Sequence, residues 1–366
     1  MTHFWFRWSS VLLVCVAAVG CGDSRTNEVQ SFPQAKAARP VGARHEAFRQ
    51  ASARQGVREE VLLAHAYLMG RFQAPPAEEH GALEAQAGHV HVPRYGMMHL
   101  TAEQVVEGAR LTGLSEAQVR EELEANVMAA AAVLRTHVEV AAGAGVAPSW
   151  EHHRAAGVAL AGIRDSIAAE GYAEELTALL GQGLDVTTPD GERLAFSAVE
   201  DFARAAGPEQ QAVTTPGAYP PMDWVAAHPN NYIIGRGGGT VRYVLIHTTE
   251  GGYWGTIDWF SQANPYQSST QYVIQSSTGN ITQMVSEANA AWHAGNDYYS
   301  RNSIGIEHEG YLNNPSYWYT EAMYRSSASL VCAIAKRYGI PVDQQHIIGH
   351  YQVPNPYAIS GSSAPG

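Results

Sequence analysis

A short, unbroken run of apolar residues predicts a buried strand in the second half of the chain. Residues Tyr243 to Ile246 are all aromatic or aliphatic. Such a run, with no polar residue inside it, is typical of a strand covered on both faces. His247 follows directly, so this strand would carry an imidazole at its C-terminal end.

A second stretch alternates between two kinds of side chain. From Ile304 to Glu309 the isoleucines and His308 hold the even positions, while the carboxylates of Glu307 and Glu309 hold odd ones. Successive side chains of a strand point to opposite faces, so Glu307 and Glu309 should share one face and His308 should lie on the other. Histidines that arrive on separate strands beside a carboxylate suit a zinc site with one position open for water.

The first half of the chain follows a helical pattern instead. Apolar residues recur at helix-like spacings, and Thr101 to Gln104 and Ser115 to Gln118 have the sequence of capping boxes at helix starts. We predict helices over residues 116–140 and 150–170. Residues 187–192 are typical of a hairpin turn between two short strands.

The two halves are separated by a stretch with no apolar period. Residues 207–222 are rich in Pro, Gly, Gln and Thr, which indicates a linker. Beyond it, residues 269–285 are typical of a β-hairpin, and residues 320–338 of a helix that ends before Gly339. We therefore predict an α/β domain over residues 223–366, with a mixed sheet and flanking helices, preceded by a mainly α-helical domain over residues 42–206.

The first residues have the pattern of an export signal. Val11 to Val19 is an apolar stretch of signal-peptide length, too short to cross a bilayer as a helix. Gly20-Cys21 falls where the small-residue cleavage site belongs. This pattern resembles a bacterial lipoprotein signal over residues 1–21, with lipid attachment at Cys21 and a flexible tether over residues 22–41. Gly22 favours delivery to the outer membrane, facing the periplasm; an ordinary signal peptide is the alternative.

The charge narrows the set of partners. The chain has 366 residues and a formal net charge of −12. Binding to nucleic acid needs clustered cations, so nucleic acid is not expected as a partner. No protein partner can be predicted from the sequence.

Four motifs resemble those of zinc-dependent N-acetylmuramoyl-L-alanine amidases, relatives of phage amidases and peptidoglycan recognition proteins. They are Tyr243-Val-Leu-Ile-His, Ala291-Trp-His-Ala-Gly, Ser303-Ile-Gly-Ile-Glu and His346-Ile-Ile-Gly-His, and they lie in order within the second half of the chain. The resemblance implies that His247 and His350 are zinc ligands and that Glu307 is the catalytic glutamate. It also implies that Trp292 and His293 lie beside the metal and bind substrate.

The resemblance implies a reaction as well. Its cofactor is Zn²⁺, its substrate is peptidoglycan, and the amide between N-acetylmuramic acid and L-alanine is hydrolysed. Glu307 would take the proton of the water and return it to the leaving amine, while zinc lowers the pKa of that water. His293 would hydrogen-bond the tetrahedral intermediate. Further aromatic faces for sugar or peptide are offered by Tyr253, Trp254, Trp259 and Tyr298.

One departure from the family concerns the third zinc ligand. The family has an Asp or Cys downstream of the second histidine, and residues 351–366 contain no Asp, Glu, Cys, His or Lys. We therefore expect either a truncated version of a longer protein or an incomplete site.

The helical half carries a weaker resemblance, to lysozyme-like transglycosylases. Residues 56–73, 95–101 and 126–134 are similar to three of their motifs, but Met69 stands where the family's catalytic glutamate belongs. A thioether cannot protonate a glycosidic oxygen. We predict a non-catalytic lysozyme-like domain that holds glycan strands; an unrelated helical domain is the alternative.

Three classes of function remain open at this point. The first is a zinc amidase, favoured by Glu307. The second is a peptidoglycan-binding or sensing lipoprotein on the same fold without turnover, favoured by the absent third ligand. The third is a glycan-cleaving enzyme, against which Met69 argues.

Overall fold

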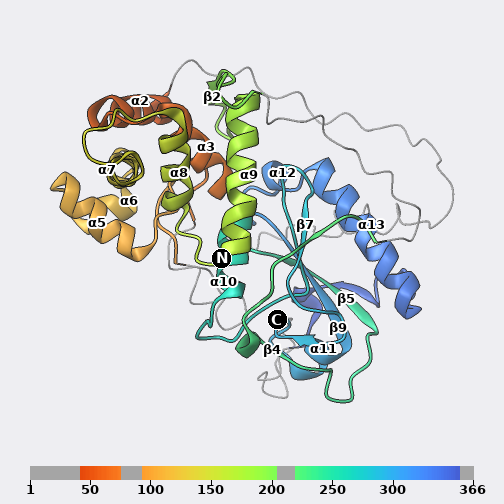
Figure 1. Ribbon diagram of the computed structural model, residues 1–366. Helices are drawn as coiled ribbons and strands as arrows, with labels where there is room; N and C mark the ends of the chain where they lie inside the picture. Colours follow the sequence, from red (N-terminus) through yellow and green to blue (C-terminus); the bar gives the residue numbers. More distant parts are fainter. Residues whose placement is uncertain (1–41, 76–92, 204–218, 355–366) are drawn as a thin grey trace, which may run out of the picture.

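The computed structural model describes residues 42–75, 93–203 and 219–354 (Figure 1). The predicted signal peptide, the tether and Cys21 lie outside these residues, as do positions 207–218 of the predicted linker. No helix in the described ranges is both long enough and apolar enough to cross a membrane.

The first half is mainly helical, as predicted, and ends in the predicted hairpin. Its helices are α2 (Ala43–Gln55), α3 (Glu59–Gly70), α5 (Ala102–Thr112), α6 (Glu116–Glu121), α7 (Leu123–Ala142), α8 (Trp150–Ala161) and α9 (Ser166–Gln182). Strands β1 (Leu184–Thr187) and β2 (Arg193–Phe196) pair antiparallel. Both predicted capping boxes are present, at Thr101 and Ser115.

Two predicted helices are each divided in two, so these predictions are wrong in detail. Glu122 is extended between α6 and α7, and the side-chain amide of Asn126 donates to the Val119 carbonyl at 2.9 Å across the break. Between α8 and α9, Gly162 adopts a left-handed conformation, and the Asp165 carboxylate then caps α9. Local side-chain hydrogen bonds thus compete with continuation of the helix.

The second half forms a mixed sheet with flanking helices, as predicted. Its strands are β3 (Asp223–Trp224), β4 (Tyr232–Ile233), β5 (Tyr243–Thr248), β6 (Tyr272–Ile274), β7 (Ile281–Gln283), β8 (Ala290–Ala291), β9 (Ser303–His308) and β10 (Ile347–Gly349). The main sheet has the order β10-β5-β9-β6-β7-β3, and β4 pairs separately with β8. All neighbours in the main sheet are parallel except the hairpin β6–β7.

Helices cover both faces of this sheet. Helix α13 (Glu321–Tyr338) packs on one face, where Leu330 and Ile334 meet Val244 and Ile306 from the central strands. Helix α10 (Tyr253–Ser261) lies on the other face, between the sheet and the first half of the chain (Figure 1). The short helices α11 (Asp297–Asn302) and α12 (Pro315–Trp318) flank β9 along the chain.

The two predicted domains share one hydrophobic cluster. Ile257 and Trp254 of α10 belong to the same buried cluster as Val61 and Leu176 of the helical half. The Trp254 indole N–H also donates to the Glu175 carboxylate on α9 at 2.8 Å. The helical half and the sheet half are therefore packed against each other through α10.

Candidate active site

Three predicted site residues meet where neighbouring parallel strands end. His247 on β5 and Glu307 on β9 are register partners, and β10 pairs with the other edge of β5. His350 follows β10 directly, and its ring centroid lies 4.7 Å from that of His247. The His247 Nδ1 atom is 3.8 Å from Glu307 Oε1. Parallel strands thus carry two imidazoles and a carboxylate to one edge of the sheet.

The two faces of β9 are divided as predicted. His308 faces α13, where its Nε2 atom lies 2.8 Å from the Ser327 hydroxyl. Glu309 accepts the backbone N–H groups of Tyr253 and Ser276 at 3.0 and 2.7 Å. Both oxygens of Glu309 are therefore used in joining loops and α10 to the sheet, which is a structural role.

Glu307 differs from Glu309 in having an unused oxygen. It is 6% exposed, and its Oε2 atom is buried with no hydrogen-bond partner among the described residues. Burial, and secondly the negative charge of Glu250, raises the pKa of Glu307 to about 8. An uncompensated buried carboxylate is costly, so its presence at a strand end indicates a site that a reacting group completes.

A chain of hydrogen bonds determines which nitrogen of His247 carries the proton. The Ser303 hydroxyl donates to the Tyr299 carbonyl at 2.5 Å, so its oxygen accepts from His293 Nε2 at 3.3 Å. His293 Nδ1 then has a lone pair and accepts from His247 Nε2 at 3.0 Å. A neutral His247 ring would therefore have its lone pair on Nδ1, the atom that lies 3.8 Å from Glu307.

The tautomer of His350 is set by a different hydrogen bond. Its Nε2 atom lies 3.1 Å from the Ala294 carbonyl, which can only accept, so Nε2 carries the proton and Nδ1 the lone pair. Burial lowers the pKa of His350 and keeps the ring neutral. Metal-binding histidines typically donate their second ring nitrogen to a carbonyl or other acceptor in this way.

These residues supply some, but not all, of the protein ligands of a zinc site. His247 and His350 present lone pairs close to one another, which matches two of the three protein ligands usual in catalytic zinc sites. Among the residues that the structure describes, no group of three or more His, Cys, Asp or Glu side chains could hold a metal ion. The predicted lack of a third ligand after His350 falls partly on residues 355–366, outside the described ranges.

Gly305 allows His293 to reach its position. A Cβ atom on Gly305 would lie 2.6 Å from the His293 ring, so a side chain there would push the ring away from β9. Trp292, the neighbouring motif residue, is partly buried, with the Arg301 guanidinium 5.7 Å from its ring. Both motif residues line the same pocket as Glu307.

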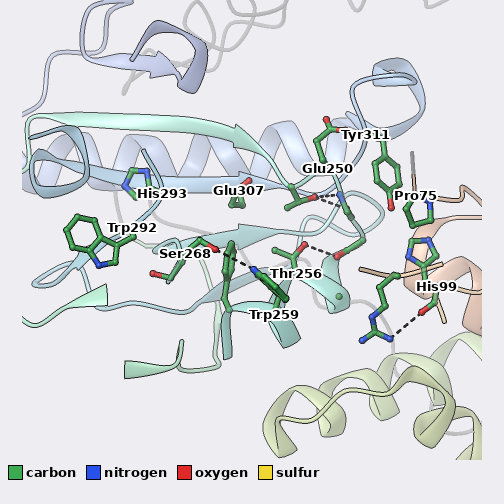
Figure 2. A pocket seen from close by; sticks show the side chains of 17 residues that line it. Pro75, His99, Glu250, Thr256, Trp259, Ser268, Trp292, His293, Glu307 and Tyr311 are labelled. Atoms are coloured by element: carbon green, nitrogen blue, oxygen red, sulfur yellow. Dashed lines mark hydrogen bonds between the residues drawn. The ribbon is translucent and has the colours of Figure 1, made fainter. Parts of the chain in front are cut away.

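This pocket is elongated and extends into the helical half of the molecule. Figure 2 shows Trp292 and His293 at one end, Glu307 in the middle, and Pro75 and His99 at the other end. Of the four further aromatic candidates only Trp259 lines the pocket, whereas Tyr253 and Trp254 are buried in the core.

Several lining residues were missed by the sequence analysis. Glu250 lies three residues after His247 and has a left-handed backbone with φ of +45°, which no local pattern signals. Arg94 and His99 reach the pocket only because the helical half packs against α10. The sequence signal nearest to them is the motif over residues 95–101, which was assigned to glycan binding.

Comparison with known proteins supports the assignment of the sheet half. Residues 237–366 match the family model "N-acetylmuramoyl-L-alanine amidase". These residues belong to that amidase family. The chain is also similar to N-acetylmuramoyl-L-alanine amidase A of Achromobacter lyticus, with 41% identity over 118 residues. This alignment covers 32% of the chain and 63% of the relative, so the chain spans less than two thirds of that relative's length.

Among solved structures, the chain is similar to the one titled "Structure of PlyL". The likeness has a TM-score of 0.31 and 15% sequence identity, and it covers 38% of this chain and 86% of that one.

Proposed function

We propose that this protein hydrolyses the amide between the lactyl group of N-acetylmuramic acid and L-alanine in peptidoglycan. The observation that carries the proposal is the meeting of His247, His350 and Glu307 at the ends of β5, β10 and β9, within a region that belongs to an amidase family.

In this reaction Glu307 acts as general base and then as general acid. Its unpartnered Oε2 takes the proton of the attacking water and returns it to the departing amine of L-alanine. Its raised pKa makes the carboxylate more basic than an ordinary glutamate and keeps both protonation states accessible near neutral pH, so the same group can accept the proton and return it. His293 holds His247 in the correct tautomer through their 3.0 Å hydrogen bond.

We propose Zn²⁺ as the cofactor, with the Nδ1 atoms of His247 and His350 as two of its ligands. When bound there, zinc would polarise the amide carbonyl and lower the pKa of the attacking water. The supporting observation is the pair of hydrogen bonds, to His293 and to Ala294, that leave both lone pairs on Nδ1.

The remaining predictions complete the proposal. Lipid attachment at Cys21 would hold the enzyme at the outer membrane, facing the periplasm, with peptidoglycan as its partner. The helical half would be a non-catalytic lysozyme-like domain, since Met69 is buried within its core and carries no acid. A binding protein without turnover is the second candidate, and the unpartnered oxygen of Glu307 favours the enzyme over it.

The test is incubation of the zinc-loaded chain with a soluble muramoyl-L-alanyl peptide, followed by mass spectrometry. We expect a free L-alanyl amine and a muramic acid carboxylate. Binding of the peptide without either product, in a preparation with full zinc occupancy, would support the sensing protein instead.

A further inference from the structure

The pocket around Glu307 is a groove between two walls. The sheet half forms one wall, and the helical half forms the second. Pro75 and His99 lie at one end of it, on the far side of Glu250 and Thr256 from Trp292 (Figure 2). Arg94 of the helical half also lines it. The family match does not require this wall, since the matched family residues begin at position 237.

The second wall is held firmly against the sheet half. A Cβ atom on Gly252, at the start of α10, would lie 1.8 Å from the Met69 carbonyl oxygen, so the two backbones touch. Arg71 extends this contact by donating to the Ser276 hydroxyl and the Tyr317 carbonyl at 2.5 and 2.8 Å. Because these contacts join backbones and buried side chains, the distance between the wall and Glu307 is fixed by the fold.

The wall contains a buried guanidinium that is not fully used. The Arg94 side chain is 4% exposed and donates to the carbonyls of Ala161, His99 and Gly162 at 2.8, 3.3 and 3.5 Å. Its Nε atom is buried without a hydrogen-bond partner in the described residues. A buried donor with no acceptor is costly unless a ligand supplies one.

Arg94 shares its nearest carboxylate with a second arginine. Asp258 is the carboxylate nearest to Arg94, at 3.6 Å, but it also pairs with Arg164 at 3.1 Å and accepts the Arg164 backbone N–H at 2.7 Å. Two guanidiniums therefore share one carboxylate. The negative charges of Glu250 and Glu307 lie on the sheet side of the groove.

One residue on each wall has a left-handed backbone. His99 and Glu250 are non-glycine residues with φ of +48° and +45°, and both line the groove. The Glu250 carboxylate accepts the Leu312 N–H at 2.9 Å, and the His99 ring donates to the Gln73 carbonyl at 2.8 Å. Strained residues held in place by buried hydrogen bonds are characteristic of ligand-binding positions.

We propose that Arg94 is a specificity-determining residue that binds a carboxylate of the peptide whose muramoyl amide reacts at Glu307. This inference rests on the proposed amidase function. The helical half then serves as the peptide-recognising wall of the amidase groove, because a guanidinium recognises carboxylates through charge-assisted hydrogen bonds.

The experiment uses matched muramoyl-L-alanyl peptides that differ in a single group, a carboxylate or the corresponding carboxamide, at each acidic position in turn. For the full zinc-loaded chain we expect one position at which the acid is preferred in kcat/KM on the order of 10- to 100-fold, mainly through KM. In Arg94→Gln this ratio should fall to about one. Arg94→Lys, which keeps the charge, should retain part of it.

Arg164→Gln is the matched control. Arg164 pairs with the same Asp258, but its side chain is 59% exposed and does not line the groove, so the acid preference should persist. The proposal is overturned if the wild-type chain shows no acid preference at any position, or if the preference survives in Arg94→Gln. Should Arg94→Gln not fold, the wild-type ratio and the partial ratio of Arg94→Lys decide.

Failure of the underlying function is distinguishable from failure of this inference. If no peptide is cleaved, the proposed amidase activity is wrong, and calorimetric binding of the same acid and carboxamide peptides still tests Arg94. Tighter binding of the acid, lost in Arg94→Gln, would support the subsite; equal binding of both peptides would refute it.

Discussion

Met69 in the helical half can be compared with Glu307 in the sheet half, because one position carries a thioether and the other a carboxylate. Each stands where a resemblance to a peptidoglycan hydrolase places a catalytic glutamate. Met69 is fully buried in the core, and its carbonyl abuts Gly252. Glu307 is nearly as buried, yet it keeps one oxygen with no partner in the described residues. The side chain at this position fills the core in the helical half, whereas in the sheet half it is a carboxylate with an unpartnered oxygen among the described residues.

The polar groups around the two positions show the same difference. In the helical half, the nitrogens of His65 lie 2.9 Å from the Tyr172 hydroxyl and 3.0 Å from the Met98 carbonyl, so both are satisfied internally. Asn126 likewise accepts from the Met98 N–H at 2.9 Å and donates to two carbonyls. Saturated hydrogen bonding indicates a structural centre, whereas an unsatisfied carboxylate beside two histidines indicates chemistry.

The largest expected effect comes from removing the base. Glu307→Gln should keep the fold and lose activity on the order of 10² to 10⁴-fold, the usual share of general acid–base catalysis. The measurement is amide hydrolysis under saturating zinc. Glu309→Gln is the control, since both Glu309 oxygens accept backbone N–H groups and its loss should affect stability more than rate. If Glu309→Gln abolishes turnover and Glu307→Gln does not, the assignment of the base is wrong.

The shared core predicts that the two halves unfold together. Ile257→Ala on α10 should cost about 2–5 kcal/mol of unfolding free energy, the range for a large-to-small change in a core. Urea unfolding can be monitored by tryptophan fluorescence and by far-UV circular dichroism. The two signals should give coincident transitions, in the wild type and in Ile257→Ala alike. Two separated transitions in the wild type would show that the halves are independent domains.

The hydrogen-bond chain to His247 predicts a smaller effect on metal binding. His293→Phe keeps a ring over Gly305 but removes the acceptor of the His247 N–H. Zinc affinity should fall about 10- to 100-fold, as is typical when a group that orients a ligand is lost. Nitrogen-15 NMR of the metal-free protein should show His247 protonated at Nε2 in the wild type. Protonation at Nδ1 in that spectrum would contradict the proposed tautomer.

A further expected effect is a pH dependence of stability in the helical half. Burial lowers the pKa of His65 to about 3 and of His99 to about 4, below the value of 6.5 for an ordinary histidine. Between pH 6.5 and about 4 the unfolded chain therefore binds more protons than the folded chain. The free energy of unfolding should fall as the pH falls, by up to about 1.4 kcal/mol per pH unit for each histidine.

Denaturant unfolding between pH 7 and pH 5 measures this dependence. His65→Gln should be less stable than the wild type at pH 7, because it loses hydrogen bonds, and the gap should narrow toward pH 5. A gap that stays constant with pH would show that His65 is not a buried neutral histidine.

Local patterns predicted most of the fold and the strand faces on which Glu307, His308 and Glu309 lie. Alternation over β9 placed Glu307 and Glu309 on one face and His308 on the other, since the period of a strand depends only on the backbone. Capping boxes located the starts of α5 and α6. The break at Glu122 was not predicted, because it depends on the side-chain amide of Asn126, four residues further along the chain. The break at Gly162 was not predicted either.

The far wall of the groove could not be predicted for a different reason. Arg94 and Glu307 are brought together only by the packing of α10 against α3 and α9, which a linear pattern does not encode. The hydrogen-bonded role of His293 was also missed, since it depends on the absence of a side chain at Gly305. Tertiary packing, and not local propensity, decides these features.

The most direct test of the account is cleavage of purified peptidoglycan by the zinc-loaded chain in water enriched in oxygen-18. The account predicts that one labelled oxygen enters the new lactyl carboxylate of muramic acid, that L-alanine gains a free amine, and that Glu307→Gln forms neither product at a comparable rate. New reducing ends or anhydro-sugars, with the muramoyl–alanine amide intact, would contradict it and would assign the activity to the helical half.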